Sequence, residues 1–247
     1  MASSETLPAP PSLAELAEAG AVALFLDFDG TLVDLAPTPD SISPVPDLAR
    51  RLGNLAKRRK GRLALISGRA IADIERHIGP VPVAAAGSHG SDIRGVDGRS
   101  LGQKPGAFPE AIEEQMRDFA QRHAIDYETK PHGGALHYRS NPEAGDAVIA
   151  YATKLAEEHG WKAQGGKFVI ELVMGDRDKG SAVRTLMAVE PFKGALPVFL
   201  GDDLTDEAGF AACIEAGGYG ILVGDREGSK AGYRLPDVAS VHQWLDL

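Results

Sequence analysis

Short apolar runs alternate with stretches of helical periodicity towards both ends of the chain. The runs show little polar alternation and end in small or acidic residues; they lie at 22–27, 63–67, 83–87, 198–202 and 219–223. Such runs are typical of strands buried on both faces of a parallel sheet. Between them, Leu48, Leu52 and Leu55 follow helical spacing, as do shorter stretches at 71–78 and 183–187. Alternating strands and helices predict an α/β fold with a doubly wound parallel sheet.

The middle of the chain has a different pattern. Ile112, Met116 and Phe119 lie on one helical stripe. Further elements are expected in the order strand, strand, long helix, strand and strand, at 125–130, 135–139, 142–159, 161–163 and 167–173. The sequence therefore predicts a smaller α/β domain inserted at 103–175, between two core segments at 20–102 and 176–247.

Residues 1–19 are predicted to form a tail and a short helix ahead of the core. The first eleven residues are expected to be disordered. Ser12 and Glu15 then have the spacing of a capping box, which would open a helix that Gly20 ends.

Composition and charge narrow the classes of function. The 247 residues have a formal net charge of −9, and the densest basic cluster, at 58–60, ends a predicted helix. This balance disfavours a nucleic-acid partner. No apolar run approaches the roughly 20 residues needed to cross a membrane, and the N-terminus lacks the features of a secretory signal. The single cysteine, Cys213, excludes an internal disulfide framework, and the seven histidines show no zinc-ligand spacing. We expect a cytoplasmic monomer without a membrane partner.

Two carboxylates follow the first predicted strand, in the sequence LFLDFDGT at 24–31. Asp27 and Asp29 stand at the carboxyl end of that strand, where open α/β sheets bind ligands. The two acids would repel each other without a cation between them, and oxygen ligands of this kind suit Mg²⁺. One carboxylate can attack phosphorus, and the other can act as general acid and then general base. Gly30 permits a sharp turn, and the Thr31 hydroxyl can hold a phosphate oxygen.

Two alternatives remain for this sequence. An EF-hand loop also contains Asp-x-Asp, but its glycine stands at the sixth position rather than the fourth, and the loop follows a helix. The stretch could also be an ordinary turn. Either alternative would leave the remaining acidic and basic motifs unexplained.

Two further positions could bind phosphate. Ser67 and the Gly68 amide follow another apolar run, in LISGR at 65–69, next to the start of a predicted helix. Ser67 could instead be that helix's N-cap. Lys179 opens a predicted helix and would supply a fixed positive charge, although a solvated lysine is the common case.

The densest acidic cluster ends the fourth core strand, in VFLGDDLTDE at 198–207. Four acids in this stretch would be electrostatically costly without a metal. Asp202 is therefore a candidate third metal ligand. Asp206, one helical turn onward, would support the ion directly or through water.

Taken in order, these positions resemble the four motifs of the haloacid dehalogenase (HAD) superfamily. The resemblance implies a Rossmann-like core in which Asp27 is the nucleophile and Asp29 the acid and base. It also implies that Lys179 is catalytic and that substrate contacts come from Thr31, Ser67, Gly68 and Arg69. The implied Mg²⁺ ligands are Asp27, Asp29, Asp202 and Asp206.

Three finer features resemble the trehalose-6-phosphate phosphatase family. They are GSHG at 87–90, ETK at 128–130 followed by ALHYR at 135–139, and GKFVIE at 166–171 leading to a Lys-Gly pair and GDDLTDE at 201–207. The resemblance covers most of residues 20–247 and implies that the insert is a type-two cap. It implies that Glu128, Lys130 and Glu171 bind sugar hydroxyls and that His89 faces the substrate.

The cap residues also allow simpler interpretations. Glu128 and Lys130 share one face of a predicted strand and could form a solvent-exposed ion pair. His89 could only shape its loop, and His137 and Arg139 could be structural.

The sequence departs from the family at one place. Val173-Met174 stands where members often carry a basic residue and a proline, and Arg177 could substitute for the former. The resemblance implies hydrolysis of trehalose 6-phosphate through a phosphoryl-aspartate. The alternatives are a phosphatase or phosphomutase acting on sucrose 6-phosphate, mannosyl-phosphoglycerate or a hexose phosphate, and a non-catalytic sugar-phosphate sensor. A sensor would be expected to lack one of the catalytic acids.

Overall fold

The chain divides into two compact units. The computed structural model describes residues 7–102, 107–130, 132–166, 168–174 and 177–247. A core unit consists of Met1–Gly102 together with Asp178–Leu247, and an inserted cap unit consists of Gln103–Arg177. Three parts of the predicted domain scheme, the tail at 1–6 and the junctions at 103–106 and 175–176, lie outside the described residues.

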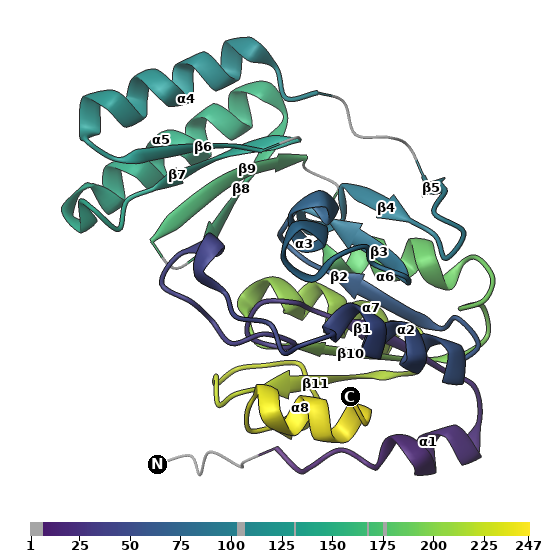
Figure 1. Cartoon of the computed structure of the whole chain (residues 1–247). Helices are drawn as coiled ribbons and strands as arrows, with labels where there is room; N and C mark the ends of the chain where they lie inside the picture. The colour runs from purple at the N-terminus through teal and green to yellow at the C-terminus, as the bar shows by residue number, and fades with distance from the viewer. Residues whose placement is uncertain (1–6, 103–106, 131, 167, 175–176) are drawn as a thin grey trace. The chain divides into compact units, whose positions relative to one another are not determined.

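An eight-stranded sheet forms the centre of the core unit (Figure 1), in the order β12-β11-β10-β1-β2-β3-β4-β5. Its strands are β1 (Val22–Leu26), β2 (Leu63–Ile66), β3 (Ala84–Gly87), β4 (Asp92–Arg94), β5 (Ser100–Leu101), β10 (Leu196–Gly201), β11 (Tyr219–Val223) and β12 (Tyr233–Leu235). The pairs from β12 to β3 are parallel, and β4 and β5 are antiparallel additions. The predicted parallel core is confirmed. The sequence does not predict β4, β5 and β12, because two or three residues carry no periodic signal.

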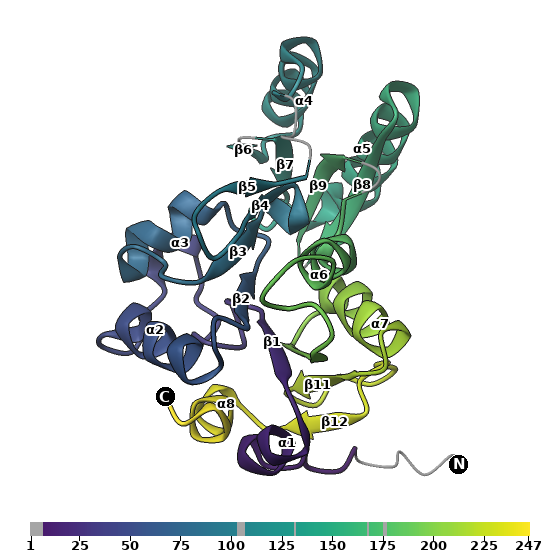
Figure 2. The ribbon, with the colours of Figure 1, turned by 90° about the vertical axis from the view of Figure 1, so that its right-hand side faces the viewer.

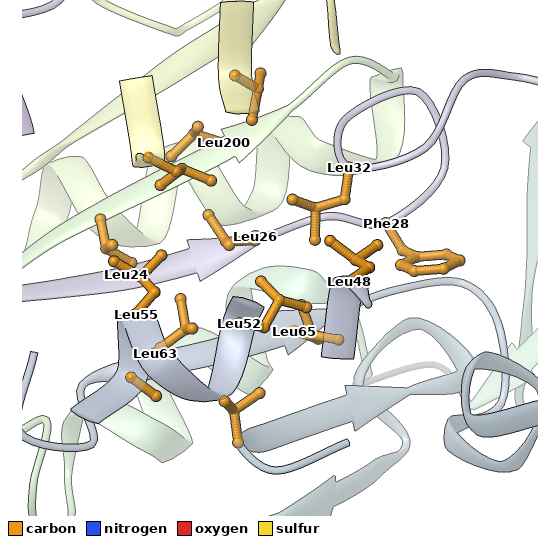
Figure 3. Packing of buried hydrophobic residues seen from close by; sticks show 14 of the residues in the cluster. Leu24, Leu26, Phe28, Leu32, Leu48, Leu52, Leu55, Leu63, Leu65 and Leu200 are labelled. Carbon is orange, nitrogen blue, oxygen red and sulfur yellow. The ribbon is translucent and has the colours of Figure 1, made fainter. Parts of the chain in front are cut away.

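Successive residues of the central strands enter two hydrophobic clusters. Leu24 and Leu26 of β1 belong to one cluster, and Phe25 belongs to the other. Because strand residues alternate between faces, the clusters lie on opposite faces of the sheet. Figure 3 shows the first cluster, where leucines of β1 and β2 meet Leu48 and Leu52.

Helices cover both faces of this sheet (Figure 2). The first cluster includes residues of α1 (Leu13–Ala19), α2 (Leu48–Arg58), α3 (Ile71–Ile78) and α8 (Val238–Leu245), and the second includes residues of α6 (Lys179–Met187) and α7 (Glu207–Glu215). The doubly wound architecture predicted from the sequence is thereby confirmed.

The amino-terminal segment packs on the carboxy-terminal elements. The capping box is confirmed: the Ser12 hydroxyl accepts from the Glu15 amide at 3.2 Å, and the Glu15 carboxylate accepts from the Ser12 amide at 2.8 Å. The expected disorder is wrong for residues 7–11. Here the Pro8 carbonyl accepts from the Arg234 amide at 2.9 Å and the Pro11 carbonyl accepts from Trp244 Nε1 at 2.8 Å. The donors come from β12 and α8, which the local sequence does not reveal.

The cap unit is an antiparallel sheet with two helices on one face. Its order is β6-β7-β9-β8, formed by β6 (Asp126–Lys130), β7 (Gly133–His137), β9 (Val169–Met174) and β8 (Trp161–Gly166). The helices are α4 (Glu110–His123) and α5 (Gly145–His159), and α5 follows a short 3₁₀ turn at Pro142–Ala144. Met116 and Leu155 of the helices pack against Leu136 and Leu172 of the strands. Alternate strand residues therefore lie on the helix-free face.

The strand order places β1 between β2 and β10. The chain runs outward from β1 to β3 on one side and returns through β10 on the other, so β1 lies at a topological switch point, where open α/β sheets bind ligands. Within the described part of the chain, no helix is long and apolar enough to cross a membrane.

Candidate active site

The loop after β1 carries the first group of predicted site residues. Asp27 is buried, and its amide donates to the Leu200 carbonyl at 2.9 Å, so strand pairing fixes its main chain. Gly30 has φ +76°, and a Cβ on this residue would lie 2.2 Å from Asp202 Oδ2. Glycine at this position therefore lets the Asp202 carboxylate approach the loop. The Thr31 hydroxyl is fully buried, and Oγ1 has no hydrogen-bond partner in the described part of the chain.

The end of β10 supplies the second group. Carboxylate oxygens of Asp27, Asp202 and Asp206 lie within 4.8 Å of one another. A Cβ on Gly201 would lie 2.3 Å from Asp206 Cγ, so the absence of a side chain there allows Asp206 to fold back under the strand end. Asp206 Oδ2 accepts from the Asp203 amide at 2.9 Å, which fixes the turn. Asp29 is not one of the three clustered carboxylates.

Lys179 joins these two groups. It is the first residue of α6, whose N-cap Asp178 accepts from the Ser181 amide at 2.7 Å. The Lys179 side chain is almost fully buried, and Nζ donates to Asp27 Oδ1 at 2.8 Å and to Asp206 Oδ1 at 2.6 Å. The alternative of a solvated lysine is wrong, because the helix start directs this side chain into the acidic cluster.

The buried charges do not balance. Burial, together with the negative charge of Asp206, raises the pKa of Asp27 well above its usual value. The same two causes raise the pKa of Asp202 to about 7. Burial alone would lower the pKa of Lys179, but Asp206 and Asp27 raise it above its ordinary value. One ammonium group therefore faces three carboxylates, which leaves an excess of two negative charges when all are ionised.

A divalent cation fits this excess charge. The three side chains offer only carboxylate oxygens, the donors that hard cations such as Mg²⁺ and Ca²⁺ prefer. Both oxygens of Asp206 already accept hydrogen bonds, from Lys179 and from the Asp203 amide. Asp27 and Asp202 are therefore better placed for direct coordination, and Asp206 for support through water.

Asp29 is held by Arg69, which the resemblance assigns to substrate binding. Arg69 Nε and Nη2 donate to the two oxygens of Asp29 at 2.7 and 2.8 Å, and Nη1 donates to Asp73 at 2.7 Å. A bidentate guanidinium–carboxylate pair is strong and directional. Arg69 thus orients Asp29 in this structure, and Asp73 orients Arg69. The i, i+4 spacing of Arg69 and Asp73 is the only sequence signal for this chain of charges.

The loop at 67–69, which carries Arg69, contacts the loop at 88–90. The Ser67 hydroxyl is buried and accepts from the Arg69 amide at 3.1 Å. Ser67 is not the N-cap of α3, because that position is Ala70. Ser88 and His89 both adopt positive φ, at 48° and 54°, and the His89 ring packs on Gly68 so closely that a Cβ there would lie 2.6 Å from Cε1. This uncommon geometry places the imidazole against the predicted phosphate loop.

The predicted cap residues form a separate cluster on the helix-free face of the cap sheet. Lys130 Nζ donates to Glu171 Oε1 at 2.9 Å and lies 3.7 Å from Glu128 Oε2. His137 Nε2 lies 2.8 Å from that same Glu128 oxygen. This bond to His137 lowers the pKa of Glu128. The alternative of an isolated surface pair within β6 is therefore too simple, because three strands contribute to the cluster.

Sequence reasoning missed other contacts near the site. Glu207 forms an ion pair with Arg226, which also contacts the main chain after β10. The two residues are 19 positions apart, and no periodicity connects them. A surface cleft elsewhere in the core unit, between α2 and residues including Pro82 and Val96, contains none of the predicted site residues.

Both the sequence and the fold match known proteins. The family model for trehalose-phosphatase matches residues 25–239. Trehalose-6-phosphate phosphatase of Escherichia coli K12 is 36% identical over 228 residues, which cover 91% of this chain and 85% of that protein. The structure of the Candida albicans trehalose-6-phosphate phosphatase C-terminal domain has a TM-score of 0.83 at 24% identity, and the match covers 99% of this chain and 100% of that one.

A more distant match identifies the fold class. A phosphatase of the haloalkanoate (HAD) enzyme superfamily from Bacteroides thetaiotaomicron has a TM-score of 0.61 at 14% identity, with 100% of this chain and 96% of that chain covered. At this identity the likeness concerns the fold alone. It agrees with the HAD-like core and inserted cap predicted from the sequence.

Proposed function

The chain belongs to the trehalose-phosphatase family, and from this premise we propose that it hydrolyses trehalose 6-phosphate to trehalose and phosphate through a phosphoryl-aspartate on Asp27. One observation carries the chemical part of the proposal. A buried carboxylate, Asp27, pairs with a buried ammonium, Lys179, just after β1, and the buried Thr31 hydroxyl of the same loop has no hydrogen-bond partner among the described residues. An incoming phosphate would satisfy that hydroxyl and oppose the lysine.

The phosphoryl transfer is assigned to Asp27 and Lys179. Asp27 attacks phosphorus, the bond to the sugar oxygen breaks, and the phosphoryl group remains on the carboxylate. Lys179, held on one Asp27 oxygen, opposes the charge on the transferring oxygens from a buried position where electrostatic interactions are strong. Ser67, Gly68 and Thr31 are proposed to bind the remaining phosphate oxygens.

The proton transfers are assigned to Asp29. It gives a proton to the departing sugar oxygen and later takes one from the water that cleaves the phosphoryl-aspartate. Because Arg69 occupies both of its oxygens, Asp29 must exchange at least one of these bonds for the sugar oxygen or the water. Arg69 is accordingly proposed to orient Asp29 as well as to face the substrate, and His89 to support the same loop.

The cation is proposed to be Mg²⁺, with Asp27 and Asp202 as direct ligands, Asp206 in support and Asp29 at the edge of the site. When bound, Mg²⁺ supplies positive charge that offsets the excess of carboxylates and the charge of the phosphate. The donor set supports this choice, since it contains oxygen atoms only.

Glu128, Lys130 and Glu171 are proposed to bind the sugar hydroxyls. A disaccharide offers many hydroxyl groups and no charge beyond its phosphate, so charged groups can read it through strong directional hydrogen bonds. The convergence of these side chains on the helix-free face of the cap sheet supports a shared role. Val173 replaces the basic residue common in the family, and Arg177 remains the proposed substitute. We further propose a monomeric enzyme of the cytoplasm, in keeping with its single, buried cysteine.

Phosphate release from a panel of esters tests the proposal. With Mg²⁺ present, we expect strong preference for trehalose 6-phosphate over sucrose 6-phosphate and mannosyl-phosphoglycerate, and no release by the Asp27→Asn variant. Preference for another ester would keep the chemistry of Asp27 and reject the cap assignment. A phosphomutase would retain the phosphoryl group and need a bisphosphorylated activator, so the absence of phosphate release from all three esters would indicate that alternative.

A further inference from the structure

Arg226 lies on the loop between β11 and β12, outside the four motifs. Both ends of that loop are held: the Gly224 amide donates to the Leu235 carbonyl at 3.0 Å, and the Gly232 amide donates to the Gly220 carbonyl at 3.1 Å. The Arg226 side chain is 22% exposed. Arg226 is therefore held in place near the carboxyl end of β10.

The guanidinium reaches two successive carbonyls of the acidic loop. Nε donates to the Asp202 carbonyl and Nη2 to the Asp203 carbonyl, each at 3.4 Å. Nη2 also donates to Glu207 Oε1. These contacts act on the main chain that carries Asp202, the side chain proposed above to bind the cation.

Glu207 fixes the arginine from the other side. Its second oxygen accepts from the Lys230 amide at 2.8 Å, so the carboxylate links α7 to the β11–β12 loop. Because the guanidinium is a planar fork, a carboxylate on one edge limits the directions in which the other donors can point. The pair thereby sets the orientation of the Asp202–Asp203 peptide.

We propose that Arg226 and Glu207 are positioning residues that hold the main chain at Asp202 and Asp203 so that the Asp202 carboxylate is presented to the divalent cation. The inference rests on the cation site of the proposed function. It concerns residues outside the proposed substrate and cation ligands, and their effect is on the affinity for the cation. Partners of this outer kind commonly change metal affinity about 10- to 100-fold when removed.

The direction in which Mg²⁺ affinity changes distinguishes a positioning role from a purely electrostatic one. Removing a positive charge near three carboxylates would strengthen cation binding if charge alone mattered. If Arg226 positions the main chain instead, its loss weakens cation binding, because the Asp202 carboxylate is then free to take other orientations. Arg226→Met is thus the informative variant, since the two explanations predict opposite directions.

The experiment is calorimetric titration of the metal-free full-length protein with Mg²⁺, without substrate. We expect Arg226→Met to raise the dissociation constant about 10-fold and Glu207→Gln to raise it by a smaller factor. Arg226→Lys should resemble Arg226→Met, because lysine keeps the charge but not the fork. Arg184→Met is the matched control: the Arg184 side chain is 53% exposed and donates twice to Glu215, at 3.1 and 2.8 Å, between α6 and α7. Its Mg²⁺ affinity should not change.

A second readout covers the metal-free state. Amide hydrogen exchange over 202–206 in EDTA should be faster in Arg226→Met and in Arg226→Lys than in the unchanged protein, while exchange in β1 stays the same. Equal or tighter Mg²⁺ binding by a folded Arg226 variant would overturn the positioning role of Arg226. If Arg226→Met does not fold, the comparison of Arg226→Lys with the unchanged protein decides in the same way. Failure of the unchanged protein to bind Mg²⁺ would instead overturn the proposed cation site, and with it the positioning role of Arg226 and Glu207. A preference for a different ester would affect neither readout.

Discussion

The charged clusters of the core unit and of the cap unit differ in burial and in charge balance. In the core unit, Lys179 is 3% exposed and is held between Asp27 and the fully buried Asp206. In the cap unit, Lys130 pairs with Glu171 while the Glu128 side chain remains 43% exposed. The core cluster has a surplus of negative charge in a largely buried site, whereas the side chains of the cap cluster are between 13% and 43% exposed.

The difference corresponds to the two tasks of the proposed reaction. Phosphoryl transfer involves large changes in charge, and preorganised buried charges oppose them most strongly. Recognition of a neutral disaccharide depends on several hydrogen bonds, each contributing modestly at a partly exposed site. Changes in the core cluster should therefore abolish turnover of every ester, while changes in the cap cluster should alter the choice among esters.

The largest expected effect is that of Asp27→Asn. Removal of the nucleophile should lower kcat by on the order of 10⁴-fold or more for all substrates, as measured by phosphate release. The variant should melt no lower than the unchanged protein in EDTA, because burial and Asp206 already disfavour the ionised form of Asp27, as its raised pKa indicates. Asp118→Asn, at an exposed cap position, is the matched control. Turnover near that of the control would exclude the covalent mechanism.

Lys179→Met should cause the largest loss of stability. It leaves Asp27 and Asp206 buried without a counter-charge, and breaking a buried ion pair in this way commonly costs about 3–5 kcal/mol. Urea unfolding in EDTA measures this loss. Lys154→Met provides the control, because the Lys154 side chain is exposed and lies at a long 3.7 Å from Glu158. Similar unfolding midpoints for both variants would show that Lys179 is not held as described.

The core site was largely predictable because its positions follow from the sheet. Asp27, Ser67 and Asp202 each stand at the carboxyl end of a predicted strand, and these ends of parallel strands meet at one edge. Lys179 follows from the start of a helix. Periodicity and the order of elements thus bring these residues together without knowledge of any side-chain contact.

The remaining contacts depend on geometry that local sequence does not encode. His137 lies near Glu128 because β6 and β7 pair in a register that sets Asp126 opposite His137, and a shift of one residue would send these side chains to opposite faces. Arg69 follows Ser67 and was expected to face the substrate, yet its planar fork is engaged by Asp29. The choice between these two partners is decided by loop conformation.

Glu171→Gln tests whether the cap cluster acts in the choice among esters and not in the chemistry. It weakens the bond from Lys130 and should lower kcat/KM for trehalose 6-phosphate about 10- to 100-fold, since a missing charged hydrogen bond costs about 1.5–3 kcal/mol. Hydrolysis of p-nitrophenyl phosphate, which has no sugar, should change less than twofold. Glu113→Gln is the control, because Glu113 pairs with Arg117 at 2.6 Å on the cap helix α4. Equal losses on both substrates would place Glu171 in the chemistry instead of in recognition.

The smallest expected effect is a pH-dependent stabilisation by Mg²⁺. Burial and Asp206 raise the pKa of Asp202 to about 7, well above the value of an exposed aspartate, so the metal-free folded state binds more protons than the unfolded chain. The free energy of unfolding should therefore fall as the pH rises from about 4 to about 7, and a cation that replaces the proton removes this loss. At a tenfold excess over its dissociation constant at pH 8, Mg²⁺ should add about 1.4 kcal/mol, or about 3–6 °C in Tm. At pH 5 the same concentration should add less, because protons compete for Asp202 and for Asp27, and Asp202→Asn should reduce the difference between the two pH values. A gain in Tm that is equal at both pH values, or larger at pH 5, would mean that the cation binds away from these carboxylates.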